Sequence, residues 1–232
     1  MKTKREQNFK RNSQDGNALL YVLIAIVLFA GLGFTLARQS HNQGVSELDD
    51  ARAELYADQL IAYAAQAQNS IDQMLFSGSE IADLDFTLPS EAGFNTAPYH
   101  NKVYHPTGGG LIPSSLNDSM KKEASPTPPA SWYLGRFNNV EWSDSTNPDV
   151  MLSAYQITRE ICEKINIKIT GSDTIPAVTV QPRTLFVDDS NYSGSNEDLT
   201  VARCPDCENY KVLCVSNPGV NIFTFYAVLA DE

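Results

Sequence analysis

NALLYVLIAIVLFAGLGFTLA, the sequence of residues 17–37, contains no Asp, Glu, Lys or Arg and is apolar along nearly all of its length. At a helical rise of about 1.5 Å per residue, a stretch of this length matches the roughly 30 Å hydrocarbon core of a bilayer. A secretory signal peptide would have a shorter apolar region ending in a small-x-small cleavage site. Residues 36–39, Leu-Ala-Arg-Gln, are bulky and charged instead. We therefore expect residues 17–37 to form a transmembrane helix.

The charges on the two sides of this stretch predict its orientation. Residues 1–16 carry five basic and two acidic residues, whereas residues 39–232 carry 11 basic and 26 acidic ones. Basic segments next to a membrane span are retained on the cytoplasmic side. We therefore expect residues 1–16 to be a basic cytoplasmic leader and the bulk of the chain to face outward.

The junction between the leader and the apolar stretch resembles that of type IV pilins and pseudopilins. Gln14-Asp15-Gly16 ends the leader, and the hydrophobic residues begin directly at Asn17. In this family a prepilin peptidase removes the leader after the Gly, and the new N-terminus is methylated. The resemblance implies processing between Gly16 and Asn17. It also implies a single-pass position in the inner (cytoplasmic) membrane, with the C-terminal domain periplasmic or extracellular, and later packing of the helix in a filament.

Two positions differ from the usual family pattern. The family commonly has Phe or Met after the Gly and a Glu four residues later, where this chain has Asn17 and Tyr21. That Glu is thought to pair with the N-terminal amine of a neighbouring subunit. The resemblance therefore implies a minor subunit of a type IV pilus or type II secretion-like assembly. Its partners would be other pilin-like subunits, the inner-membrane assembly machinery, prepilin peptidase and the membrane. The alternative is a signal-anchored envelope protein that does not polymerise and whose outward domain binds a partner or ligand.

Residues 38–78 are predicted to form a helical stalk. Apolar residues recur there at three- and four-residue steps, as expected for one face of a helix. Gly78 follows the last of them, at the position of a helix C-cap. The residues of this face are Tyr56, Leu60, Tyr63, Ala67, Ile71 and Met74.

The remaining residues predict one α+β head. Residues 79–130 are rich in Pro and Gly and are expected to form loops, with a structural turn at Gly108-Gly109-Gly110. Residues 131–232 are expected to form the head core, an antiparallel sheet with one further helix at 149–165. A hairpin is predicted at 131–137 and 140–142, and a second at 210–216 and 221–229. Additional strands are predicted at 177–180 and 184–187.

The four cysteines, Cys162, Cys204, Cys207 and Cys214, all lie in the outward part of the chain. Disulfides persist in an oxidising compartment, and four cysteines allow three pairings. We expect one bridge from Cys162 to Cys204 or Cys207. A zinc site and a redox Cys-Pro-Asp-Cys motif are the alternatives, but the chain lacks the paired doublets of the first and the thioredoxin-like βαβ context of the second.

One acidic segment is a candidate calcium loop. Asp189, Asn191 and Ser193 place oxygen ligands at alternate positions, and Glu197 and Asp198 add carboxylates. A complete EF-hand would need Glu where Thr200 stands, so a solvated acidic turn is the alternative. No other cofactor is expected. The three histidines form no catalytic motif, which predicts a protein that is not an enzyme, and the acidic head predicts no binding to nucleic acid.

Overall fold

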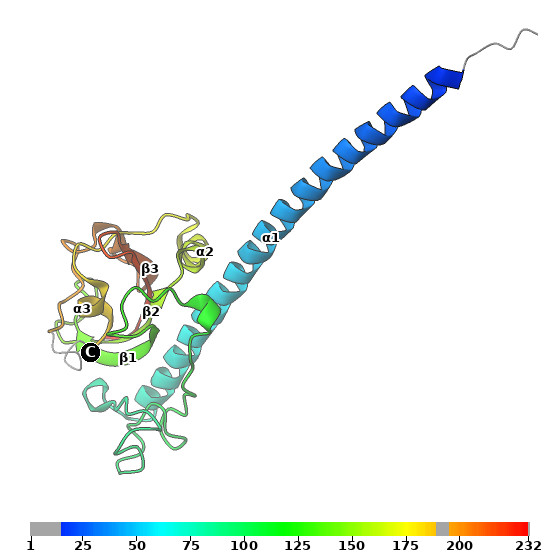
Figure 1. Ribbon diagram of the computed structural model, residues 1–232. Helices are drawn as coiled ribbons and strands as arrows, with labels where there is room; N and C mark the ends of the chain where they lie inside the picture. Colours follow the sequence, from blue (N-terminus) through cyan, green and yellow to red (C-terminus); the bar gives the residue numbers. More distant parts are fainter. Residues whose placement is uncertain (1–14, 189–194, 232) are drawn as a thin grey trace, which may run out of the picture. The chain divides into compact units, whose positions relative to one another are not determined.

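The computed structural model describes residues 15–188 and 195–231, with side chains between residues 15 and 48 described only at 27–29. The chain divides into two compact units, residues 1–49 and residues 50–232. We call the second unit the head. The first helix, α1, runs from Asp15 to Phe76 and contributes residues to both units (Figure 1).

The C-terminal end of α1 confirms the predicted cap at Gly78. The Gly78 amide donates to the Leu75 carbonyl, and the Ser79 amide donates to the Met74 carbonyl, both at 3.0 Å. Gly78 has a φ of 100°, which a glycine adopts without steric cost. These two hydrogen bonds form a Schellman motif, so the chain leaves the helix at a defined point.

The head contains a four-stranded antiparallel sheet with the strand order β1-β2-β4-β3. Its strands are β1 (Ser131–Asn138), β2 (Asp149–Ile157), β3 (Val212–Asn217) and β4 (Ile222–Ala230). The other regular elements among residues 15–188 and 195–231 are two short helices, α2 (Arg159–Thr170) and α3 (Pro182–Phe186), and the 3-10 turns η1 (Ile81–Asp83), η2 (Asp118–Met120) and η4 (Pro205–Cys207).

Helices cover both faces of this sheet. On one face, α2 and the head's part of α1 share a core with alternate residues of the central strands, such as Leu152 and Phe225. On the other face, Met151 and Tyr226 pack with α3. Figure 1 shows the sheet lying between α2 and α3. Strands β2 and β4 are consequently buried along their whole length.

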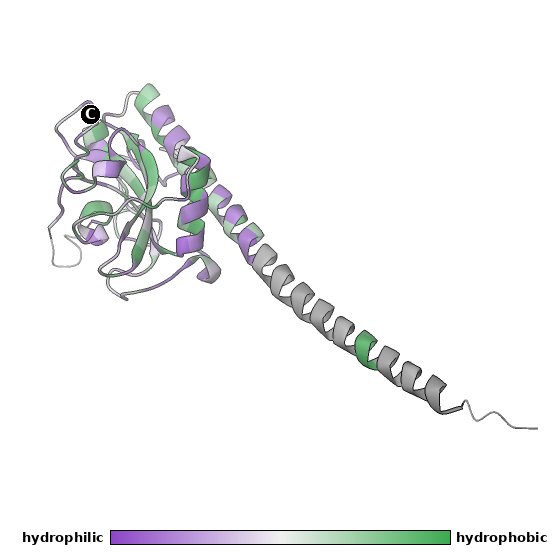
Figure 2. Ribbon diagram, turned by 90° about the horizontal axis from the view of Figure 1, so that it is seen from above, coloured by the Kyte–Doolittle hydropathy of each residue, from purple (hydrophilic) through white to green (hydrophobic). Residues whose placement is uncertain are grey.

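The head's part of α1 buries the predicted apolar face. Five of its six predicted residues are buried, and Tyr56 is partly buried against the same core. The most buried positions include Ala57 and Ala67, whose small side chains let the helix backbone approach the core closely. Figure 2 shows hydrophobic and hydrophilic residues alternating along this part of the helix. The contact holds the helix on the sheet mainly through burial of apolar surface.

The prediction of a helix at 149–165 is wrong for the first half of that range. Residues Asp149–Ile157 form strand β2, and the helix begins only after Thr158. Thr158 is an N-cap with extended backbone angles whose Oγ1 accepts from the Ile161 amide. The residues before it are apolar without a period because both faces of β2 are covered, and such a run is easily mistaken for a buried helix.

Three predicted strand segments are also wrong. The strand expected at 184–187 is replaced by α3, which begins at Pro182. Between 177 and 180 there is only a single bridge, from Ala177 to Ser216. Strand β1 pairs with β2 rather than with residues 140–142, and Val140 forms its own bridge to Leu199.

Other predictions are confirmed. The head has the α+β class with an antiparallel sheet, and β3 and β4 form the C-terminal hairpin. Residues 79–130, all of them described, contain no strand or α-helix, only the turns η1 and η2 and isolated bridges.

Candidate functional site

Side chains from three parts of the head fix α1 on the sheet. The Tyr63 ring packs against Trp132 of β1 in a tilted arrangement with ring centroids 4.7 Å apart, and its hydroxyl donates to the Ile112 carbonyl at 3.2 Å. Burial raises the pKa of Tyr63, so this hydroxyl remains a donor well above neutral pH. On the flank beside α2, Lys164 pairs with Asp50 at 2.6 Å. The helix is therefore held by apolar burial in the centre and by polar contacts on its flanks.

The Gly-rich turn, which was predicted to have a structural role, packs directly against α1. The Ser70 hydroxyl donates to the Gly109 carbonyl at 2.8 Å. A Cβ atom added to Gly109 would lie 2.5 Å from the Val103 carbonyl oxygen and 2.7 Å from the Met74 sulfur. Only glycine fits this close approach, so the turn fastens the loop region to the helix.

The predicted processing site lies outside the described side chains. Gly16 and Asn17 belong to the helical backbone of α1, and most side chains of the predicted span 17–37 are likewise outside the described set. Its described residues, Val27, Leu28 and Phe29, are 61–77% exposed. Within the described part of the chain, no helix combines the length and apolar character needed to cross a bilayer.

The cysteines form two disulfides, but not with the pairing we expected. Cys162 on α2 is bonded to Cys214 on β3, and Cys204 is bonded to Cys207. The expected bridge from Cys162 to Cys204 or Cys207 is therefore wrong. Cys214 is the partner because α2 packs across β3, whereas η4 lies on the opposite face of the sheet. All four sulfurs are buried.

The candidate calcium loop is only partly described. Asp189, Asn191 and Ser193 lie outside the described residues. Glu197 pairs with Arg203 at 2.6 Å, and Asp198 accepts a hydrogen bond from the Asn139 amide at 3.0 Å. Both carboxylates thus connect neighbouring loops. Among the described residues, no group of three or more His, Cys, Asp or Glu side chains could hold a metal ion.

A groove of about 880 Å³ lies beside β1 in the head. One wall is β1, from Ser131 to Phe137, and the other is the extended segment 84–88. Aromatic side chains line both walls, and Tyr104 adds a further ring from outside them; the rings on the walls are Phe86, Trp132, Tyr133 and Phe137. Its volume is within the usual range for ligand sites, roughly 300 to 1,000 Å³. We call it the β1 groove.

The charges of the β1 groove are mostly negative. Asp85, Glu91 and Asp188 line it, against one cation, Arg136. Partial burial acts to raise the pKa of Asp85, but hydrogen bonds from Thr87 and the Lys102 ammonium 3.0 Å away hold it below its usual value. Asp85 is therefore ionised at neutral pH. Sequence reasoning missed this groove because it depends on which strand lies at the sheet edge.

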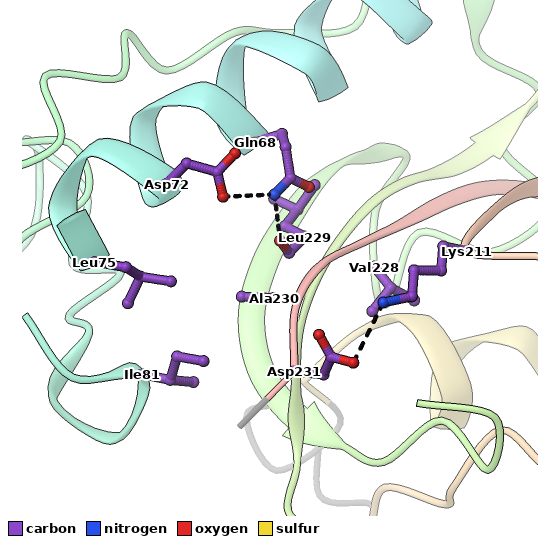
Figure 3. Close-up of a pocket in the computed structure, with 9 residues that line it drawn as sticks. All are labelled: Gln68, Asp72, Leu75, Ile81, Lys211, Val228, Leu229, Ala230 and Asp231. Atoms are coloured by element: carbon purple, nitrogen blue, oxygen red, sulfur yellow. Dashed lines mark hydrogen bonds and ion pairs between the residues drawn. The ribbon is translucent and has the colours of Figure 1, made fainter. Parts of the chain in front are cut away.

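A smaller hollow of about 290 Å³ lies between α1 and the end of β4 (Figure 3). The Gln68 amide donates to Asp72 at 2.9 Å and to the Leu229 carbonyl. Lys211 and Asp231 form an ion pair at 3.3 Å on the opposite side. The hydrogen bond from Gln68 to Leu229 links the last strand to α1, and Lys211 and Asp231 neutralise each other on the other side. We call this hollow the polar seam.

A buried carboxyl lies near this seam. Asp149 at the start of β2 is fully buried, and its Oδ2 accepts from the Val140 amide at 2.7 Å. Its other oxygen has no hydrogen-bond partner within the described structure. Burial raises the pKa of Asp149 to about 6, with the nearby negative charge of Asp231 adding to the effect. This carboxyl is a pH-dependent element of the head's stability.

Comparisons with known proteins found no relative of this chain. Neither a scan against protein-family models nor searches of curated proteins and solved structures gave a match to this chain.

Proposed function

We propose that this protein is a pilin-like or pseudopilin-like minor subunit of a type IV pilus or type II secretion-like envelope assembly. In this proposal, residues 17–37 first anchor the chain in the membrane and later pack against the helices of other subunits. The head faces outward and catalyses no reaction. The single observation that supports the proposal best is that one helix, α1, ends in a face buried on an antiparallel sheet.

Further support comes from the N-terminal unit taken alone. Val27, Leu28 and Phe29 lie on successive positions of α1 and expose 61%, 61% and 77% of their surfaces. Adjacent large apolar side chains in water favour burial, either in lipid or against another helix. The basic leader before Gly16 provides the orientation that such an anchor needs.

Photocrosslinking tests the assembly step. A photoreactive phenylalanine at position 29 of the full chain, in its native cells, is expected to form adducts with other helix-bearing subunits of the same assembly. The same probe at position 76 is a matched control, because Phe76 is 96% exposed but lies at the head end of α1. Adducts limited to lipid at position 29 would contradict assembly and favour a signal-anchored protein that does not polymerise.

A further inference from the structure

The two outer strands of the sheet differ in how their free edges are covered. An uncovered edge presents rows of N–H and C=O groups that can pair with another strand, and proteins usually block such edges. At β3, the Asn166 side chain accepts from the Cys214 amide at 2.9 Å and donates to the Cys214 carbonyl at 2.8 Å. The segment 176–178 pairs with both backbone groups of Ser216. The β3 edge is therefore covered at Cys214 and Ser216.

The β1 edge has no such cover in the described structure. Strand β1 pairs with β2 on one side, so alternate residues direct their backbone groups to the other side. Within the described residues, no hydrogen bond from outside β2 reaches the backbone of Trp132, Leu134 or Arg136. The β1 groove runs along this edge.

The dimensions and lining of the β1 groove suit an extended peptide. Residues 131–137 span about 23 Å at the strand rise of about 3.3 Å per residue. A peptide added as a strand would gain main-chain hydrogen bonds from β1, and alternate side chains would lie among the aromatic rings of the groove. Arg136 closes one end of it, where its guanidinium donates to the Ala82 carbonyl at 3.1 Å.

Charge selects the kind of peptide. The head carries 11 Lys and Arg residues against 24 Asp and Glu residues, a net charge of −13. The groove itself has three carboxylates and one guanidinium, and one of the carboxylates, Asp85, is paired with the Lys102 ammonium behind it. A second copy of the head would bring more negative charge to this surface, whereas a basic segment would be attracted to it.

We propose that the β1 groove is a docking site for an extended segment of a different protein, which adds to β1 as a strand. This segment has apolar side chains at alternate positions and a net positive charge. The proposal does not depend on the fate of the leader or on helix assembly, so its failure would leave the proposed function untouched.

Binding of synthetic peptides to the full-length protein in detergent tests the proposal. The probes are peptides of about eight residues, the length of β1, with Val, Tyr or Phe alternating with Lys or Thr. We expect saturable binding, and protection of β1 amides from hydrogen exchange. N-methylation of alternate peptide amides in one register is expected to weaken binding by about tenfold or more, because each main-chain bond contributes a factor of roughly 2 to 10. Methylation in the other register should have little effect.

Matched variants test the role of charge. Glu91→Gln is expected to weaken binding of the Lys peptides about twofold, since it removes one exposed negative charge of the groove but keeps an acceptor for the Leu88 amide. Glu123→Gln, at another exposed position, should not change it. Peptides in which each Lys is replaced by Glu should bind more weakly than the Lys peptides.

Several results would overturn the proposal. These are no saturable binding at about 1 mM peptide, equal binding of both methylated registers, or protection confined to β3. Equal affinity for Lys and Glu peptides would rule out the charge selection. Self-association of the protein that protects β1 would assign the groove to a second copy instead.

Discussion

Removal of the two disulfides, one at a time, is expected to destabilise the head by very different amounts. In the chain-entropy description, a disulfide stabilises the folded state by restricting the unfolded chain, and the effect grows with the length of the closed loop. Cys162 and Cys214 are 52 residues apart, and Cys204 and Cys207 are three apart. The corresponding contributions are about 4 and about 1.5 kcal/mol. All four sulfurs are buried, so losses in packing affect both pairs.

The assay is urea unfolding of the full chain, followed by tryptophan fluorescence. Both tryptophans, Trp132 and Trp142, lie in the head, so the signal reports this unit alone. We compare the double variants Cys162→Ala/Cys214→Ala and Cys204→Ala/Cys207→Ala with the parent protein. Equal losses in the free energy of unfolding, or a larger loss for the second variant, would refute the reasoning. A disulfide-linked peptide joining Cys162 to Cys204 would refute the pairing itself.

Three further predictions concern the head. Asp149 has a pKa of about 6 in the folded protein and about 3.8 in the unfolded chain. Because the folded state holds this proton more tightly, the contribution of Asp149 to the free energy of unfolding is fully present below pH 4. That contribution declines by about 3 kcal/mol as the pH rises through 6. Unfolding of Asp149→Asn between pH 4 and 7 should lack this decline, and an unchanged slope would exclude Asp149 as its source. Ile71→Ala should lower the free energy of unfolding by about 2–5 kcal/mol, because it leaves a cavity under α1. Leu55→Ala, at a 55% exposed position, should lower it by less than about 0.5 kcal/mol. Equal urea midpoints for the two variants would contradict the packing of Ile71 in the core. Gly109→Ala should lower the melting temperature of the head by forcing the turn away from Ser70, and an unchanged melting temperature would show that the close approach is not required.

The parts of the fold that the sequence predicted are those with a clear period or a clear turn. The apolar face around Ile71 repeats at helical spacing, and Gly78 follows it as a cap, so both were predicted. The hairpin of β3 and β4 was predicted because the turn residues 217–220 separate two apolar runs. In each case a local pattern coincides with the final structure.

The errors come from tertiary contacts that no local pattern encodes. Strand β2 is covered on both faces, which removes the alternation that would have distinguished it from a helix. Thr158, the true start of α2, is an N-cap signal that could have placed the boundary. The pairing of Cys162 with Cys214 and the position of β1 at the edge of the sheet depend on strand order, so spacing alone could not predict them.

The central claim is that this chain is processed and assembled like a pilin. Its most direct test is the N-terminal sequence and intact mass of the protein recovered from its native membranes. The account predicts a chain that begins at Asn17 with a methyl group on its amine. A chain that still begins at Met1, in cells whose prepilin peptidase processes other substrates, would contradict it.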